Sequence, residues 1–547
     1  MSSARFARWV VASLGSVALA PLSGQQPAAP APPVFGETVE VRVVNLEVVV
    51  TDRDGLPVAG LGPSDFRLMV DGAETPIGFF TEVRGGTAIE GPGGETVAGL
   101  PDLAPGAPVG TSYLVFVDDF FALARDRDRV LEAIAAQLGR LGPEDRMAIV
   151  AWDGRELAML TSWSTSSAEL ERALKTARAR PALGLRRIAE RRSFLDDSRL
   201  RRRNSRIAAV DRLDVTEIHY AQTLEQQIDN TVSAAAAALR GFANPPGRKV
   251  LLLLSGGWPY DIVEFVARDV GRIVHESRID RGDRLYAPLV DTANRLGYTI
   301  FGVDVPGLAT DFDRGAERSE LPGETGEFGS FLRENNAQYS LHYVSRETGG
   351  TALVNAARLQ ALERAAAATR TYYWIGFTPA WMGDDQRHRV EVELRREGLR
   401  VASRSGYLDT SRAREVSMAV ESVLLFGGGP GVRPLALEVG IPKRSSLGRM
   451  RVPIRFELPV SEVTFLPSGP SRVADLELRV AAVDEYGGRS EVPVIPIRLT
   501  LPGEPEPGGV AGQETTLELR RTGNRLAVAV YDPLSGTIWS ATAEVRP

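Results

Sequence analysis

Apolar and polar side chains alternate over residues 38–84, and the alternation is interrupted by two Asp-Gly pairs, Asp54-Gly55 and Asp71-Gly72. A period of two is typical of half-buried strands, and Asp-Gly favours the tight turns of hairpins. The pattern therefore predicts a small β-domain over residues 38–84.

Residues 111–410 show a different pattern, in which uninterrupted apolar runs alternate with segments of helical periodicity. The runs cover residues 113–117, 147–153, 250–255 and 298–305, and the longest helical segment covers residues 216–242. Runs without alternation are typical of strands buried on both faces of a parallel sheet. Strands that alternate with helices predict a doubly wound, mostly parallel α/β domain. We expect this domain to carry insertions at about 181–215 and 258–290.

The last part of the chain, residues 411–547, contains short alternating segments separated by turn residues such as Asp532-Pro533. Several short strands with regular turn signals predict a β-sandwich, whose first strand we place at residues 416–425. The predicted fold class is thus α/β. A doubly wound sheet is flanked by an N-terminal small β-domain and a C-terminal β-sandwich.

The N-terminus has the features of a secretory signal peptide over residues 1–24. Arg5 and Arg8 precede a short apolar stretch, which is too short to span about 30 Å of hydrocarbon. Residues 25–37 form a Pro/Ala-rich tether, and residues 85–110 form a Gly/Pro-rich linker. We expect export to the periplasm, the cell envelope or the extracellular space, and no transmembrane span in the mature chain.

Composition narrows the classes of function. The formal net charge is −6, which argues against a dedicated nucleic-acid binder, because phosphate neutralisation needs clustered Lys and Arg. The chain has no cysteine, so disulfides, thiol catalysis and Cys-ligated zinc are excluded. Of the four histidines, no two have metal-ligand spacing, and a His-rich metal centre is not expected.

Several segments occur in a fixed order between residues 40 and 407. They are VVVTDRDGLPVAGLGPSDFRLMVDG, YLVFVDDFFALARDRDRVLEAIAAQL, LGPEDRMAIVAWD, GRKVLLLLSGG, ANRLGYTIFGVDVPG, SRETGGTALVN, TYYWIGFTPAW and SRSGY. In content and order they resemble the secreted von Willebrand factor type A-related proteins that are abundant in Acidobacteria. The resemblance implies an α/β domain over residues 111–410 that presents a surface to protein ligands.

The same resemblance implies a position for a metal-ion-dependent adhesion site. In the family this site has the pattern D-x-S-x-S, a threonine from a second loop and a distal aspartate, which suit magnesium. The matching positions here are Asp118, Phe120, Ala122, Thr161 (or Ser162 or Ser164) and Gly256. Because both serines and the distal aspartate are replaced, the resemblance implies a degenerate site. We expect no cofactor; magnesium or calcium would be the cation if one were held.

Asp118 and Asp119 are also the best candidates for catalysis, as a carboxylate pair after a buried strand. Adjacent residues at a strand end point to opposite sides, and no nucleophile motif or histidine pair accompanies them. We therefore expect a non-catalytic binding, adhesion or scaffolding protein that engages protein partners. The alternatives are an envelope hydrolase that uses the Asp118/Asp119 loop, or an assembly factor for surface structures.

Residues 186–206 contain nine arginines. One interpretation is a basic arm that contacts an anionic surface through Arg201, Arg202 and Arg203. The other is a solvated insertion helix whose arginines pair with neighbouring acidic side chains. Because the net charge elsewhere is negative, the pattern favours the solvated helix over the basic arm.

Overall fold

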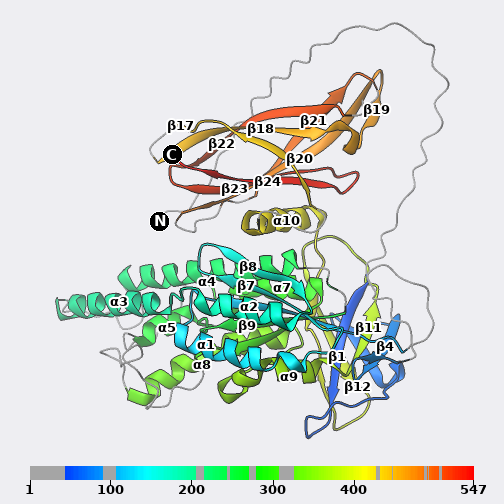
Figure 1. Ribbon diagram of the computed structural model, residues 1–547, viewed down its shortest axis with the longest axis vertical. Helices are drawn as coiled ribbons and strands as arrows, with labels where there is room; N and C mark the ends of the chain where they lie inside the picture. The colour runs from blue at the N-terminus through cyan, green and yellow to red at the C-terminus, as the bar shows by residue number, and fades with distance from the viewer. Residues whose placement is uncertain are drawn as a thin grey trace. The chain divides into compact units, whose positions relative to one another are not determined.

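The computed structural model describes most of the chain after residue 42. The described residues are 43–89, 106–204, 213, 215–242, 245, 247–269, 279–306, 326–426, 432–445, 448–485, 490, 492–503 and 508–547. They form two compact units, which lie within Val43–Pro430 and Gly431–Pro547 and which we describe separately (Figure 1). The predicted signal peptide, the tether and most of the linker lie outside the described residues.

A five-stranded sheet forms the centre of the first unit, in the order β10-β9-β6-β7-β8. β6 (Thr111–Asp118) is buried along its whole length and pairs in parallel with β7 (Arg146–Trp152) and β9 (Arg248–Ser255). β10 (Tyr298–Asp304) is parallel to β9, whereas β8 (Leu157–Ser164) is antiparallel to β7. Burial on both faces explains the unbroken apolar runs of these strands.

Ten helices of the first unit are described, and most of them pack onto this sheet. Apolar side chains of α1, α2 and α9 share a core with one face, and those of α4, α5, α7 and α8 share a core with the other. The helices are α1 (Ala124–Ala136), α2 (Ser167–Ala179), α3 (Gly184–Asn204), α4 (Val215–Gly241), α5 (Ile262–Asp269), α6 (Gly282–Leu285), α7 (Ala287–Leu296), α8 (Gly326–Glu347), α9 (Ala361–Thr369) and α10 (Arg412–Phe426).

Two antiparallel sheets complete the first unit, with the orders β13-β1-β11-β4-β5 and β14-β12-β2-β3. β1 pairs with both β11 and β13, and β2 pairs with β12. Figure 1 shows the result as blue strands from the start of the described chain beside yellow-green strands from near residue 390. The strands are β1 (Val44–Thr51), β2 (Phe66–Val70), β3 (Ala73–Glu74), β4 (Phe79–Arg84), β5 (Thr87–Ala88), β11 (Tyr372–Phe377), β12 (Arg387–Leu394), β13 (Arg400–Ala402) and β14 (Gly406–Leu408).

The second unit consists of two sheets that share one apolar core. Its longest pairings join β18 to β22, and β20 to both β21 and β23. Alternate residues of β18 are buried, so one side of this strand faces the core and the other faces outward. The strands are β15 (Val432–Pro434), β16 (Ala436–Val439), β17 (Lys443–Arg444), β18 (Arg449–Pro459), β19 (Leu466–Ser468), β20 (Ser471–Asp484), β21 (Val494–Leu501), β22 (Val510–Arg520), β23 (Asn524–Tyr531) and β24 (Ile538–Val545).

The predicted fold class is wrong for this chain. A doubly wound, mostly parallel architecture would describe at most one of the five sheets, and that sheet is mixed because β8 is antiparallel. The remaining strands lie almost entirely in antiparallel pairs, so the chain is β-rich and partly sandwich-like. The expected N-terminal β-domain is not self-contained either, because β1 and β2 complete their sheets with strands from residues 372–402.

The strand predicted at residues 416–425 is also wrong, since these residues lie in α10. Val416, Val420, Val423 and Leu424 are its buried apolar side chains. Their spacing of four, three and one places them on one face of a helix, and that face packs against α4. The apolar residues of this segment therefore follow a helical period rather than a strand period.

Candidate functional site

The carboxyl ends of the parallel strands carry a buried carboxylate at the last residue of β6. Asp118 Oδ1 accepts hydrogen bonds from the backbone N–H groups of Phe120 and Phe121, at 3.1 and 3.2 Å. Asp118 Oδ2 accepts from Ser255 Oγ at 2.8 Å and from Trp258 Nε1 at 2.9 Å. Burial raises the pKa of Asp118 to about 6, although the hydrogen bond from Trp258 opposes that shift.

The neighbouring carboxylate, Asp119, is held by two guanidinium groups. Asp119 Oδ1 accepts from Arg127 Nη1 at 2.6 Å, and Oδ2 accepts from Arg180 Nε at 2.9 Å. Burial raises the pKa of Asp119, and the hydrogen bond from Arg180 opposes the shift. Arg127 is itself buried and also donates to the carbonyl oxygens of Arg178 and Arg180. The negative charge of Asp119 and the positive charges of Arg127 and Arg180 therefore compensate one another inside the protein.

Three positions that the resemblance aligned with metal ligands, Phe120, Ala122 and Gly256, follow β6 or β9 at this edge of the sheet, and none offers a side-chain ligand atom. The guanidinium of Arg187 lies over the ring of Phe120, 4.3 Å from its centroid. Ala122 is buried in the core below the sheet edge. A Cβ atom at Gly256 would lie 2.1 Å from the backbone carbonyl oxygen of Phe121, so the family's aspartate does not fit there without a backbone shift.

Thr161 does not join Asp118. It lies within β8, opposite Ile149 of β7, and its hydroxyl contacts Ser162 O and Glu169 Oε1. Ser164 Oγ donates to the same glutamate, at 2.6 Å to Oε2. Two of the three hydroxyls considered for the threonine position, those of Thr161 and Ser164, are thus engaged by Glu169, at the start of α2.

The arginine-rich segment forms helix α3, which packs on α4. Phe194 stacks on Tyr220 with ring centroids 4.2 Å apart, and Leu195 is buried. Near the start of the helix, Arg187 forms an ion pair with Glu190. The residues assigned to an anionic partner fall within α3, but their side chains are not among the described ones; they are Arg201, Arg202 and Arg203.

A cavity of about 350 Å³ lies at the opposite end of the mixed sheet, where β9 and β10 begin. Three cationic side chains line it, Lys249, Arg295 and Arg404, and burial lowers the pKa of Lys249 and of Arg404. Lys249 Nζ donates to the carbonyl oxygen of Leu296 at 2.6 Å, and Arg404 donates to the carbonyl oxygens of Asn45 and Asn294. These bonds link β9 and β1 to the C-terminal end of α7.

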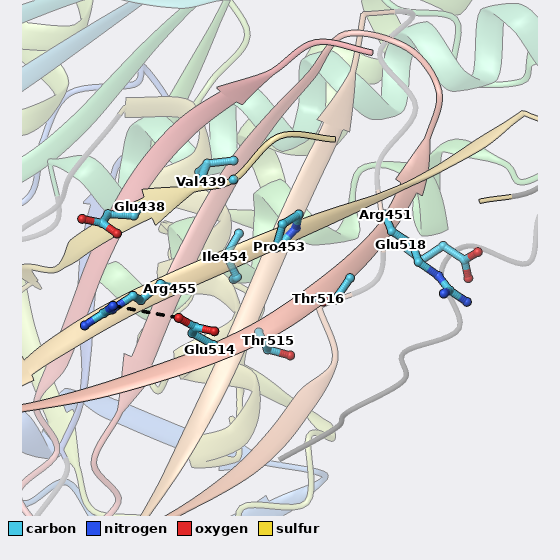
Figure 2. Close-up of a pocket in the computed structure, with 11 residues that line it drawn as sticks. Glu438, Val439, Arg451, Pro453, Ile454, Arg455, Glu514, Thr515, Thr516 and Glu518 are labelled. Atoms are coloured by element: carbon cyan, nitrogen blue, oxygen red, sulfur yellow. Dashed lines mark ion pairs between the residues drawn. The ribbon is translucent and has the colours of Figure 1, made fainter. Parts of the chain in front are cut away.

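A larger groove, of about 600 Å³, crosses the outward face of β16, β18 and β22 in the second unit (Figure 2). Arg455 and Arg451 of β18 stand directly opposite Glu514 and Glu518 of β22. Arg455 Nη1 and Glu514 Oε1 are 4.0 Å apart, as the dashed line in Figure 2 marks, and both side chains are at least half exposed. Glu438 lines the groove from β16. The groove was not predicted from the sequence, although charged residues recur along β18 and β22.

Comparisons with known proteins do not assign the chain to a family. No family model and no curated protein matches it. A β-glucuronidase of Bacteroides uniformis matches at 12% identity over 20% of this chain and 13% of its own, with a TM-score of 0.15. The pilus adhesin SpaC from Lactobacillus rhamnosus GG matches at 8% identity over 87% of this chain and 60% of its own, with a TM-score of 0.25. This chain thus covers less than two thirds of either protein, and likenesses this low carry no argument about function.

Proposed function

We propose that the protein is an exported, non-catalytic binding or scaffolding protein that engages a protein partner. The observation that carries this proposal is the groove across β16, β18 and β22, where side chains of both charges stand on an open strand face. Within the described residues, no helix combines the length and the apolar character needed to cross a bilayer.

The chemistry of the groove favours a polypeptide over a small molecule. Sites for small molecules are usually enclosed and lined mainly by apolar side chains. This groove is instead lined by Arg451, Arg455, Glu514 and Glu518, which are spaced by the regular repeat of two antiparallel strands. Like charges recur every fourth residue along each strand, about 13 Å apart, so an extended segment with opposite charges at that spacing would match the groove.

The hydrolase alternative is less well supported. An acid or base must come within hydrogen-bond reach of the substrate. Asp118 and Asp119 are both fully buried, and their oxygens accept hydrogen bonds from the protein itself. The raised pKa of Asp118 favours the hydrolase, because a general acid works best with a pKa near the working pH. An assembly factor for surface structures would use the groove in the same way, and differs only in the identity of its partner.

The proposal is tested by site-specific photo-crosslinking on native cell envelopes. A crosslinker at Thr516, in the groove, should capture a protein, whereas one at Thr500 of β21 should not. The double change Arg451→Glu and Arg455→Glu should weaken capture more than about tenfold, because reversed charges disfavour a charge-matched partner. Arg498→Glu, whose exposed arginine pairs with Asp475 outside the groove, is the matched control. Equal capture by both variants would contradict a binding role for the groove. Ester, peptide or glycoside hydrolysis that Asp118→Asn abolishes would contradict the non-catalytic role.

A further inference from the structure

A second group of ionisable side chains lies in the first unit, away from the carboxyl ends of the mixed sheet. Asp384 precedes β12, His388 lies in β12, and Asp409 follows β14. β12 and β14 pair in antiparallel fashion, with His388 opposite Tyr407, which brings the three residues together. One ligand atom of each lies within 4.8 Å of those of the other two.

The two ring nitrogens of His388 have different surroundings. Nδ1 lies 2.7 Å from Asp71 Oδ2, and the ring stacks on Tyr407 with centroids 4.9 Å apart. Nε2 is buried and has no hydrogen-bond partner in the described part of the chain. Buried polar atoms are nearly always satisfied, so such an atom needs an explanation. A carboxylate on one nitrogen, with the other nitrogen free, is how proteins orient a histidine that binds a metal.

The two carboxylates are held in place but keep capacity for a ligand. Asp409 is almost fully buried, and its oxygens accept from the backbone N–H groups of Met382 and Gly383. Asp384 is exposed, and its Oδ1 accepts from the N–H of Gln386 at 2.9 Å. A carboxylate oxygen has two lone pairs, so one backbone hydrogen bond leaves it able to bind a cation.

We propose that Asp384, His388 and Asp409 form a binding site for a divalent cation, and that zinc fits it best. One imidazole nitrogen and two carboxylate oxygens suit zinc, whereas magnesium and calcium prefer oxygen ligands alone. Zinc bonds to such atoms are about 2.0–2.2 Å long, so the ligand atoms must close slightly around the ion. The exposed Asp384 has the freedom to make this movement. Asp71 positions His388, and a fourth coordination position stays open to water.

This site is independent of the proposed binding groove, which lies in the other unit. The sequence predicted no cofactor, because that prediction considered only histidine pairs and the Asp118 loop. A zinc site at Asp384, His388 and Asp409 departs from that prediction. The proposed ligands are His388 of β12, Asp384 four residues before it, and Asp409, which directly follows β14 and approaches β12 only in the folded chain.

Isothermal titration of the tag-free mature chain with zinc chloride tests the site. We expect one zinc per chain. His388→Gln and Asp384→Ala should each weaken zinc binding at least about tenfold, and Asp71→Asn by about 10- to 100-fold, because outer carboxylates orient the ligand. His342→Gln removes an exposed histidine of α8 and is the matched control, which should bind zinc as the unmodified chain does.

Cobalt gives a second measurement that a purely structural role of these residues would not affect. Co²⁺ bound at the site should show visible d–d absorption, which excess zinc removes and which is absent in His388→Gln. Circular dichroism should show that each variant is folded. The proposal is overturned if zinc does not bind saturably at micromolar concentration, or if folded His388→Gln and Asp384→Ala bind it unchanged.

Discussion

Two clusters of the first unit contain similar acidic side chains but differ in how far the protein satisfies their hydrogen bonds. At the carboxyl ends of the mixed sheet, Asp118 receives two side-chain and two backbone donors, and Asp119 receives two guanidinium groups. In the cluster of Asp384, His388 and Asp409, the carboxylates are held by backbone N–H groups, and one imidazole nitrogen has no partner within the described residues.

The difference shows that buried charge alone does not identify a binding site. Four donors saturate Asp118, and two guanidinium groups neutralise Asp119, so these carboxylates hold neighbouring loops together. The second cluster keeps unused coordinating capacity in a group that is already oriented, which is what a ligand site requires. The comparison can be tested by removing one group at a time from each cluster.

The largest effect is expected from Arg127→Met in the first cluster. The change leaves Asp119 with one guanidinium partner in place of two, and removes the donors to two backbone carbonyls. Removing one partner of a buried ion pair leaves an uncompensated charge, so the free energy of unfolding should fall by about 3–5 kcal/mol.

Urea denaturation measures this loss, with Arg140→Met as the control. Arg140 forms an exposed ion pair with Glu363, with Nη2 and Oε1 3.5 Å apart. Exposed pairs contribute about 0–1 kcal/mol, so the control should be almost neutral. Equal losses of unfolding free energy in the two variants would mean that the ion pairs of Asp119 do not stabilise the fold.

A smaller, pH-dependent effect is expected from Asp118→Asn. Burial raises the pKa of Asp118 from 3.8 to about 6, so the folded state binds this proton more tightly than the unfolded state does. The stability from this group is fully present below pH 4 and is lost as the pH rises through about 6. A shift of about two pKa units corresponds to about 3 kcal/mol.

The measurement is the free energy of unfolding at several values between pH 4 and pH 7, taken as the difference between the two proteins. Over this range the unmodified chain should lose about 3 kcal/mol relative to Asp118→Asn, which has no such titration. A difference that stays constant with pH would show that the Asp118 carboxylate is not desolvated as the fold implies.

The smallest effect is expected from Asp384→Ala in the second cluster, measured with a chelator present. Asp384 is exposed and accepts one local backbone hydrogen bond, so the free energy of unfolding should change by less than about 1 kcal/mol. A loss as large as that of Arg127→Met would mean that the second cluster also stabilises the fold and is not mainly a ligand site.

Local features of the fold could be predicted from the sequence, because they depend on periodicity. The run at residues 250–255 lies in β9, and the helical segment at 216–242 corresponds to α4, with boundaries off by a residue or two. Pairing over long distances could not be predicted in this way. Nothing in the alternation of residues 38–84 indicates that their partners are strands more than 300 positions away.

In the candidate sites, too, single residues could be predicted from local sequence, whereas their partners across the fold could not. Asp118 was found because it ends an apolar run, but its partners Ser255 and Trp258 come from a distant strand and loop. His388 was passed over because no second histidine lies at a suitable spacing. Its neighbours, Asp71 and Asp409, are adjacent only through the pairing of β2, β12 and β14.

The pairing of β1 with β11 has a consequence for biosynthesis. The first described strand cannot complete its sheet until a segment more than 300 residues later has emerged from the ribosome. At about 5–20 residues per second, that delay is roughly 15–60 s. During this time an apolar strand with open edges is a target for aggregation unless a chaperone covers it. The order of synthesis thus favours holding the nascent chain unfolded until β11 is available.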